Sequence, residues 1–177
     1  GNYYSETIPD SAIKYYMEVL AIAEKMDIKM IDKKNRMQAL AEINLAGVYV
    51  KTGEYEKAIN TCRHGISLIK NKYAYIAIAG NYTLGDALRH LKKYTEAEAV
   101  TAAALKESAN ANLRDQAVQG YVTLANIYKD PKQYQKALEA MDTLIALKDT
   151  IMTAEKVKAI NQVEAKYNMA DKDARIT

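Results

Sequence analysis

The sequence of 177 residues predicts an all-α solenoid built from antiparallel helix pairs. A short pattern occurs three times along the chain, with a period near 40 residues. Within each copy the apolar residues recur at helical spacing. Glycine and proline, which interrupt helices, occur only 7 and 2 times. Because a short helix pair cannot bury its apolar face alone, successive pairs must stack on one another.

The repeated pattern is Leu-small-x-x-Tyr followed, after a turn, by Tyr-x-x-Ala. Its alanines are Ala58, Ala97 and Ala137, which lie 39 and 40 residues apart. A tyrosine lies three residues before each alanine, a leucine lies thirteen before it, and a small residue follows each leucine. We expect the small residues to let the two helices of a pair approach closely. These tyrosines, leucines and small residues are Tyr55, Tyr94, Tyr134, Leu45, Leu84, Leu124, Ala46, Gly85 and Ala125.

The first expected element is a partial repeat over residues 1–36. Ala12 begins the pattern of the second helix of a pair, so the leucine of the first helix would lie upstream of the chain. Tyr3 falls at the tyrosine position of that first helix. We therefore expect the chain to begin inside a repeat, with Gly1 as the remnant of a tag.

Two sequence features predict where helices break or extend in this first region. Pro9 and Asp10 predict a turn followed by a helix start. The charged stretch from Asp27 to Arg36 predicts a loop or a helix extension. Three repeats then follow, at about residues 37–72, 73–111 and 112–150.

The last expected element is a capping or exit helix over residues 151–172. Ile160, Val163 and Tyr167 reproduce the first helix of a pair, in register with the copies before it. Glu164 occupies the position where a small residue would let a second helix pack. We therefore expect a cap with one solvated face. The apolar spacing would also suit a homodimer through this helix; the residues concerned are Val157, Ile160, Val163, Tyr167 and Ala170.

The composition argues against several functions. The net charge is only +3 and lysine is interspersed with glutamate, so we expect no nucleic-acid binding. No apolar run approaches the roughly 18 residues of a membrane span, and no signal-peptide pattern opens the chain. We therefore expect no membrane contact by this segment, although a longer parent protein would be free to carry a transmembrane helix.

The residue types that usually carry catalysis or bind metal are scarce. The single cysteine, Cys62, cannot form an internal disulfide, and its helical position predicts a buried inert thiol. The two histidines, His64 and His90, fall on separate predicted helices. There is no phosphate-binding glycine loop and no metal-type Cys/His spacing. We therefore predict that the chain is not an enzyme, with no catalytic residues, no metal site and no cofactor.

The repeat resembles the tetratricopeptide repeat, in which a large aromatic, Leu-Gly and Tyr precede an alanine and a further aromatic. The opening aromatic is present only in the third copy, as Tyr121. The resemblance implies a single domain over residues 1–177, a right-handed superhelix of about 7–8 helices with a C-terminal capping helix. The period exceeds the usual ~34 residues, which is similar to the long-helix members found in regulatory and scaffold proteins.

The C-terminal part, over about residues 118–172, has a second resemblance. It is similar to the last repeat and exit helix of bacterial membrane-tethered sensor and regulator proteins. In those proteins the repeats are commonly extracytoplasmic, and a transmembrane helix and a histidine kinase or helix-turn-helix output domain follow. The segments that carry the resemblance are Tyr134 to Leu138, Leu147 to Ile151, Glu155 to Lys158 and Glu164 to Tyr167.

This second resemblance implies a non-enzymatic, protein-binding region of a bacterial signal-transduction protein or transcriptional regulator. It favours an extracytoplasmic location, and a cytoplasmic one stays open. A free-standing scaffold or adaptor is the alternative within the same class. A small-molecule receptor or an enzyme that uses the concave pocket is the alternative from a different class.

The resemblance to the tetratricopeptide repeat implies that the first helices of the pairs line a concave groove that would bind a protein or peptide segment. Its residues are expected on the side of each helix opposite the leucine. They are Ile43, Asn44, Gly47, Val50 and Lys51, then Tyr82, Thr83, Asp86, Arg89 and His90, then Val122, Thr123, Asn126, Lys129 and Asp130. The predicted binding residues among them are Asn44, Lys51, Tyr82, Asp86, Arg89, His90, Asn126 and Lys129.

Two expectations follow from this set. If Tyr82 contacts a ligand, Tyr82→Ala should leave the fold nearly intact. Some members of the family clamp a C-terminal carboxylate with lysine, arginine and asparagine, and we do not expect that activity here. The corresponding positions hold Ile43, Gly47, Thr83, Gln119 and Thr123, which provide no cation. For each residue of the set, the alternative is a solvated polar face without a ligand.

Overall fold

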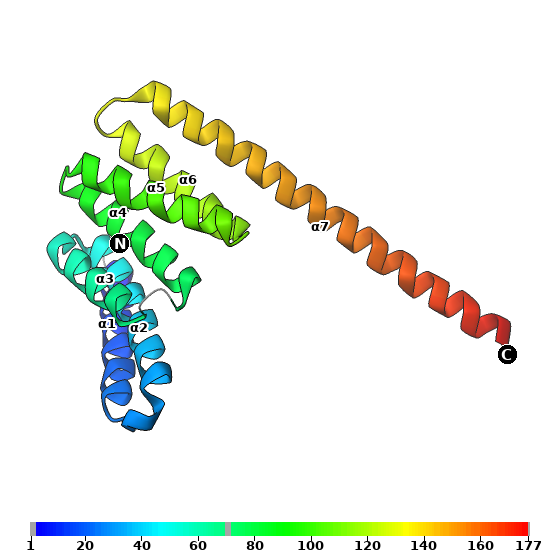
Figure 1. Cartoon of the computed structure of the whole chain (residues 1–177), viewed down its shortest axis with the longest axis horizontal. Helices are drawn as coiled ribbons and strands as arrows, with labels where there is room; N and C mark the ends of the chain where they lie inside the picture. The colour runs from blue at the N-terminus through cyan, green and yellow to red at the C-terminus, as the bar shows by residue number, and fades with distance from the viewer. Residues whose placement is uncertain (1–2, 70–71, 177) are drawn as a thin grey trace.

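The computed structural model describes residues 3–69 and 72–176, and it describes side chains over 9–69 and 72–162 and at Glu164. Within these residues the chain forms α-helices and one short 3₁₀ helix (Figure 1). The all-α prediction is confirmed. The elements are α1 (Tyr3–Glu24), η1 (Ile28–Met30), α2 (Ile31–Thr52), α3 (Tyr55–Ile69), α4 (Ala74–His90), α5 (Tyr94–Asn110), α6 (Arg114–Lys129) and α7 (Tyr134–Ile176).

The helices stack as a solenoid. Each α-helix packs against the next one along the chain, and α4 also packs against both α2 and α6. Among the described helices, α3, α5 and α7 do not contact one another. The layer formed by α2, α4 and α6 is therefore the tighter one, and it lies on the concave side of the stack. This arrangement confirms the predicted solenoid of antiparallel pairs α2/α3, α4/α5 and α6/α7.

The repeat residues form the core. Ala58 and Ala97 have no exposed surface, and the leucines Leu45, Leu84 and Leu124 are buried. One apolar cluster runs through the stack and includes residues from α2 to α7. Because the same positions are buried in each copy, the sequence period is also the packing period.

The turn inside each helix pair contains one residue in the left-handed region. These residues are Gly53 with φ 84°, Lys92 with φ 61° and Lys132 with φ 62°. They occupy equivalent positions, five residues before the repeat alanine. Only glycine adopts this conformation without a steric penalty, which is about 1–2 kcal/mol for other residues. The second and third turns therefore carry strain that the first does not.

We expect Lys92→Gly and Lys132→Gly each to stabilise the fold by about 0.5–1 kcal/mol, since glycine's larger entropy in the unfolded chain offsets part of the relieved strain. Each substitution should raise the melting temperature by about 2–4 °C, measured by thermal unfolding. The reverse change, Gly53→Lys, should lower it. Equal melting temperatures for all of these variants would contradict this account of the turns.

The first helix differs from its prediction. The expected turn at Pro9 is absent, because α1 runs from Tyr3 to Glu24 with Pro9 inside it. A proline inside a helix removes one backbone hydrogen bond and either kinks or ends the helix, and here the helix continues past it. The charged stretch after Asp27 belongs to η1 and then to the start of α2, so it is largely a helix extension. Gly1 and the side chain of Tyr3 lie outside the described residues.

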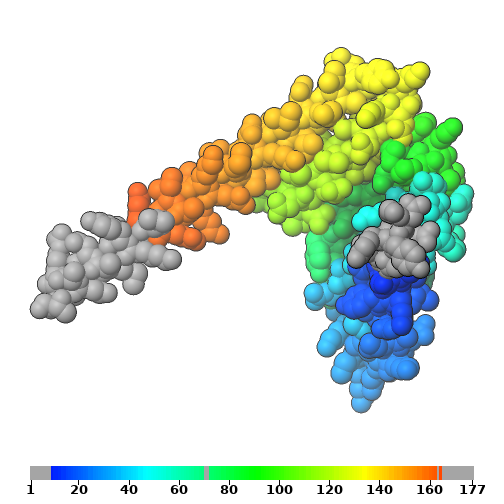
Figure 2. Space-filling view, turned by 180° about the vertical axis from the view of Figure 1, so that it is seen from behind, coloured from blue at the N-terminus to red at the C-terminus, as the bar shows by residue number. Residues whose placement is uncertain are grey.

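The last helix also differs. A second helix of a pair and a separate capping helix over 151–172 were expected, but α7 is one helix of 43 residues. Neither glycine nor proline occurs in it, so no residue interrupts the backbone hydrogen bonds. Its first half packs on α6, and its second half extends away from the stack (Figure 1, Figure 2). The sequence predicted a cap with one solvated face. In the structure, the side chains of residues 152–162 are exposed on every side of the helix.

None of the helices that the structure describes combines the length and the apolarity that crossing a lipid bilayer requires.

Candidate functional site

A groove of about 470 Å³ lies across the concave layer of helices. Side chains from all three inner helices line it, which is the arrangement expected of a solenoid that binds along its concave face. The lining residues are Gly47, Val50 and Lys51 of α2, Ala79, Tyr82, Thr83 and Asp86 of α4, and Asp115, Gln116, Gln119, Val122, Thr123 and Asn126 of α6.

The groove combines apolar side chains with a row of amides. Val50 of α2 and Val122 of α6 provide apolar contact area on opposite sides of α4. Gln116, Gln119 and Asn126 lie on one face of α6 at spacings of three and seven residues. Each carboxamide can both donate and accept hydrogen bonds. The wall formed by α6 can therefore bind a polar backbone, while the valines can contact small apolar side chains.

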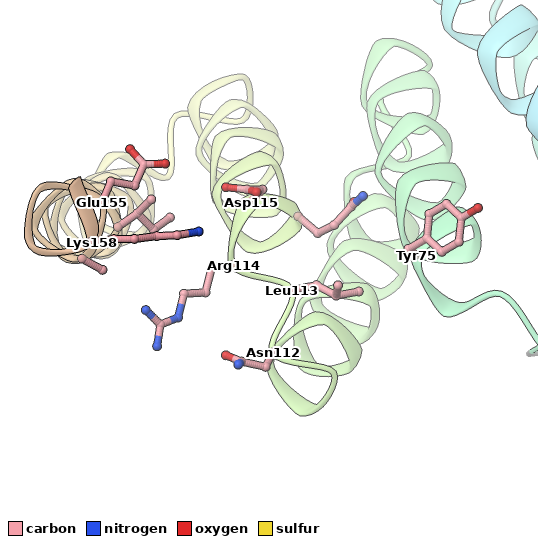
Figure 3. A pocket seen from close by; sticks show the side chains of 10 residues that line it. Tyr75, Asn112, Leu113, Arg114, Asp115, Glu155 and Lys158 are labelled. Carbon is pink, nitrogen blue, oxygen red and sulfur yellow. The ribbon is translucent and has the colours of Figure 1, made fainter. Parts of the chain in front are cut away.

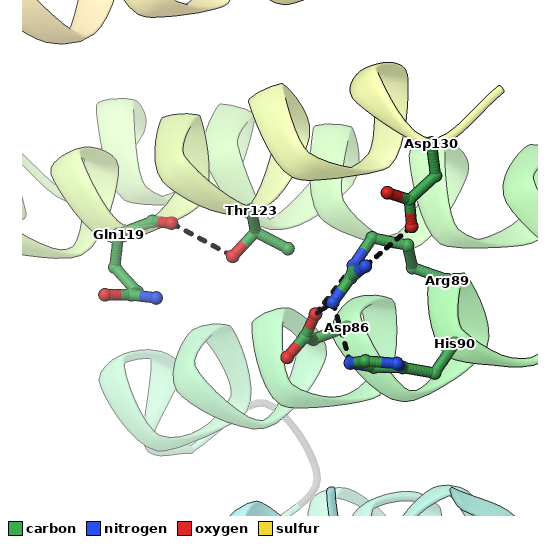
Figure 4. Close-up of polar contacts among 6 residues, drawn as sticks. All are labelled: Asp86, Arg89, His90, Gln119, Thr123 and Asp130. Atoms are coloured by element: carbon green, nitrogen blue, oxygen red, sulfur yellow. Dashed lines mark hydrogen bonds and ion pairs between the residues drawn. The ribbon is translucent and has the colours of Figure 1, made fainter. Parts of the chain in front are cut away.

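Two threonines in the groove use their hydroxyl protons within their own helices. Thr83 Oγ1 donates to the carbonyl oxygen of Ala79 at 3.2 Å. Thr123 Oγ1 donates to the carbonyl oxygen of Gln119 at 3.0 Å (Figure 4). Their hydroxyl protons are thus already engaged, and the amides are the main uncommitted polar groups of the wall.

A family model described as tetratricopeptide repeat matches residues 43–72 and 118–150. The chain contains tetratricopeptide repeats. The two matches fall on the pairs α2/α3 and α6/α7, and the pair α4/α5 lies between them with the same packing. Neither the curated proteins nor the solved structures gave a match. Tetratricopeptide repeats are in general modules that bind proteins or peptides, and the fold is a scaffold rather than a catalytic one.

Tyr82 lies differently in this repeat domain than the sequence predicted. Its side chain is only 3% exposed and packs with Ile78 and Ala104. Its hydroxyl donates to Ser108 Oγ at a long 3.5 Å, and burial raises its pKa. A Cβ on Gly120 would lie 2.6 Å from the Tyr82 hydroxyl, so the ring end fills the space that this glycine leaves open. Tyr82 lines the groove with a ring that belongs to the core, and its predicted ligand contact stays a prediction.

Arg89 was predicted to contact a ligand, but it connects α4 to the end of α6. Its Nε donates to Asp86 Oδ1 at 2.9 Å, and its Nη1 donates to Asp130 Oδ2 at 2.6 Å (Figure 4). The side chain is only 15% exposed. His90 lies 2.7 Å from Arg89 Nη2, and its ring stacks on Tyr55 with centroids 4.5 Å apart. Neither Arg89 nor His90 lines the groove.

The other predicted binding residues divide between three locations. Lys51, Asp86 and Asn126 line the groove, and Asn44 is exposed on α2 outside it. Lys129 lines a separate cavity between α6 and α7. Ile43, from the wider predicted set, is buried in the core.

The prediction missed four lining residues, namely Ala79, Asp115, Gln116 and Gln119. Three of these belong to the first turns of α6. The spacing of Gln116, Gln119 and Thr123 places them on one helix face, and that signal was available in the sequence.

A second cavity, of about 500 Å³, lies between α7 and the start of α6. Glu155 and Lys158 of α7 lie across from Arg114 and Asp115 of α6, with Tyr75 of α4 on the far side (Figure 3). Charges of both signs line it, and only one of the three inner helices of the tetratricopeptide repeats contributes more than a single residue. The groove across α2, α4 and α6 is therefore the better candidate for the binding site.

The described part of the chain contains no group of three or more His, Cys, Asp or Glu side chains that could hold a metal ion. Cys62 is fully buried, as predicted. Burial, followed by the nearby Glu42 carboxylate, raises the pKa of its thiol to about 12. His64 Nδ1 lies 2.7 Å from Glu42 Oε2 on the surface of the first repeat, and His64 does not line the groove.

Proposed function

We propose that the groove across α2, α4 and α6 binds an extended segment of a partner protein. The observation that carries the proposal is the row of amides, Gln116, Gln119 and Asn126, in a groove that spans all three inner helices. An extended segment presents an N–H and a C=O group at every residue, and carboxamides pair with both. Its side chains alternate in direction, so every second one can point into the groove and contact its apolar lining. No histidine or cysteine lines the groove, which supports binding without catalysis.

The charges in the groove favour one direction of the bound segment. Lys51 lies on α2 and Asp115 on α6, and α4 separates these two helices. Neither side chain forms an ion pair with another described residue. Asp86 is already paired with Arg89. We therefore expect a partner segment with an acidic group near α2 and a basic group near α6, and binding that weakens as salt is added.

Gly47→Arg tests the groove directly. A Cβ on Gly47 would meet no atom within 4 Å, so the arginine can project into the groove without disturbing the core. Peptides selected from a random library on the wild-type chain should bind the variant at least ~10-fold more weakly, which corresponds to about 1.4 kcal/mol. Affinity would be measured by fluorescence anisotropy.

Asn60→Arg is the matched control, because Asn60 is exposed on α3 outside the groove and receives the same charge. It should bind the selected peptides like the wild type. Equal affinities for the wild type and both variants would place the binding site elsewhere on the molecule.

We further propose that these repeats are the sensory region of a bacterial membrane-tethered signalling protein or transcriptional regulator, on the extracytoplasmic side. The support is the resemblance over residues 118–172 together with the course of α7. The amide-bearing helix α6 packs on α7, and α7 then continues as one helix away from the groove. Under this proposal, occupation of the groove acts on α7 through α6.

The sequence encoded after the codon for Thr177 distinguishes a sensory region from a free-standing scaffold. An apolar segment of about 20 residues followed by a kinase-like or DNA-binding region would support it. Further repeats, or a stop codon close by, would favour a free-standing scaffold or adaptor.

A further inference from the structure

The first half of α7 carries an apolar face that no described helix covers. Its members are exposed to between 48% and 58%; they are Tyr134, Leu138, Met141 and Ile145. The equivalent residues of the first repeat are all buried or half-buried; they are Tyr55, Ile59, Cys62 and Ile66. In the first and second repeats the following helix, α4 or α6, packs on this face. In the third repeat α7 packs on α6 alone.

A cavity of about 410 Å³ marks the uncovered position between α6 and α7. Its lining is largely apolar and consists of Val122, Ala125, Asn126, Lys129, Tyr134, Ala137, Leu138, Met141 and Leu144. The corresponding place between α2 and α3 is taken by α4, which contacts both helices, and α6 takes the place between α4 and α5. The cavity therefore has the location of the first helix of a fourth repeat.

The second half of α7 has the sequence of such a helix. Ala159 occupies the register position of Gly80 and Gly120, four residues before the repeat leucine, and Val163 occupies the leucine position itself. The position four residues before the repeat leucine requires a small residue. A Cβ on Gly80 would lie 2.9 Å from Ile66 Cγ1, and one on Gly120 would lie 2.6 Å from Leu105 Cδ2.

This second half cannot reach the cavity of its own chain, because the turn that would bring it back is absent. In the second repeat that turn contains Asn112 with φ 54°, fifteen residues after the repeat alanine. The equivalent residue of the third repeat is Met152, which lies inside α7. In the first repeat the equivalent residue is Tyr73, with φ −124°, so a left-handed residue is not what every such turn requires. In the third repeat the helix runs without interruption through Met152 and carries its second half away from the stack (Figure 1).

We propose that two copies of the chain exchange the second halves of their α7 helices. Each second half fills the cavity between α6 and α7 of the other copy. The two α7 helices then run antiparallel in one symmetric contact, and both cavities are filled. The contacts of Gly80 with Ile66 and of Gly120 with Leu105 fix the register, which places Ala159 of one copy against Ile145 of the other. These residues lie seven positions on either side of Met152, so the two-fold axis passes close to Met152.

The charges around Met152 fit this axis. Lys148 and Glu155 lie on one edge of the apolar face, and Asp149 and Lys156 lie towards the other. The two-fold axis places each edge of the apolar face next to the same edge of the α7 helix in the second copy. Lys148 then meets Glu155 of the second copy, and Asp149 meets its Lys156. Within one chain, none of the four forms an ion pair with a described residue.

The oligomeric state tests the exchange. Light scattering coupled to gel filtration should give twice the mass of the chain for the wild type. Ile145→Glu places an unpaired charge in the contact and should weaken the dimer at least ~100-fold, with the helical content unchanged because Ile145 is exposed in the single chain. Val157→Glu is the matched control. Its register equivalent, Ile78, packs with Ala104 of its own pair, and no such partner helix exists for Val157. The control should remain a dimer.

A single cysteine tests the register. Met152→Cys should cross-link two chains on oxidation, because residue 152 lies next to its own copy at the axis, whereas Val157→Cys should not. The native Cys62 is buried and does not interfere. A monomeric wild type would overturn the proposal, whether α7 folds back on its own chain or binds another protein. A dimer that survives Ile145→Glu, or that cross-links through Val157→Cys, would also overturn it.

Discussion

Ala97→Arg is expected to unfold the middle helix pair. Ala97 has no exposed surface, and its carbonyl oxygen would lie 3.5 Å from a Cβ on Gly85 of the facing helix. An arginine there has neither room nor an ionic partner, and an unpaired buried charge costs about 3–5 kcal/mol or more. That is a large part of the about 5–15 kcal/mol by which a domain is stable.

The expected result is a chain with much reduced helical signal in far-UV circular dichroism and a urea midpoint far below that of the wild type. Because each repeat contacts only its neighbours, loss of the middle pair also separates the two ends of the stack. Ala99→Arg is the matched control, since Ala99 lies on the same helix and is exposed. A folded Ala97→Arg variant with the stability of this control would contradict the packing of α4 on α5.

Tyr82→Ala is expected to destabilise the chain by about 3–5 kcal/mol, the cost of removing a buried aromatic side chain. This reverses the expectation from sequence, in which Tyr82 was a ligand contact that could be truncated without harm. The ring is 3% exposed and packs with Ile78 and Ala104, so alanine would leave a cavity at the centre of the stack.

Urea unfolding measures this difference. Tyr75→Ala is the control from the same helix, because Tyr75 is 40% exposed, and it should cost about 1 kcal/mol or less. Tyr82→Phe should stay close to the wild type, since it removes only a long hydrogen bond. Equal stabilities for Tyr82→Ala and Tyr75→Ala would restore the groove assignment of Tyr82.

The fold could be predicted because the same apolar pattern occurs in three copies of the repeat, and each copy indicates the same helix packing. The alanine and leucine positions are buried in each copy, and their helical periodicity and constant spacing of thirteen residues suit a helix pair. The length of α7 could not be predicted in the same way. Apolar residues with helical spacing look alike in one long helix and in two short ones. The residue at the turn position does not distinguish them either, because it is Tyr73 in the first repeat, Asn112 in the second and Met152 in the third.

The groove was predictable only in part, because long-range contacts decide which residues of a helix face it. Arg89 does not line the groove because its guanidinium binds Asp130, which lies 41 residues away in the sequence. Tyr82 is covered because Gly120 leaves space for its hydroxyl. Neither partner can be inferred from the pattern of α4 alone. The amides of α6 share one helix face through local spacing alone, which the sequence shows directly.

The central claim is that the groove across α2, α4 and α6 binds a protein segment, and amide NMR with a selected peptide tests it most directly. The side-chain carboxamide signals of Gln116, Gln119 and Asn126 should shift on titration, together with the backbone amide of Gly47, and signals from α3 should not. Shifts confined to Arg114, Glu155 and Lys158, or to the exposed face of α7, would contradict the claim.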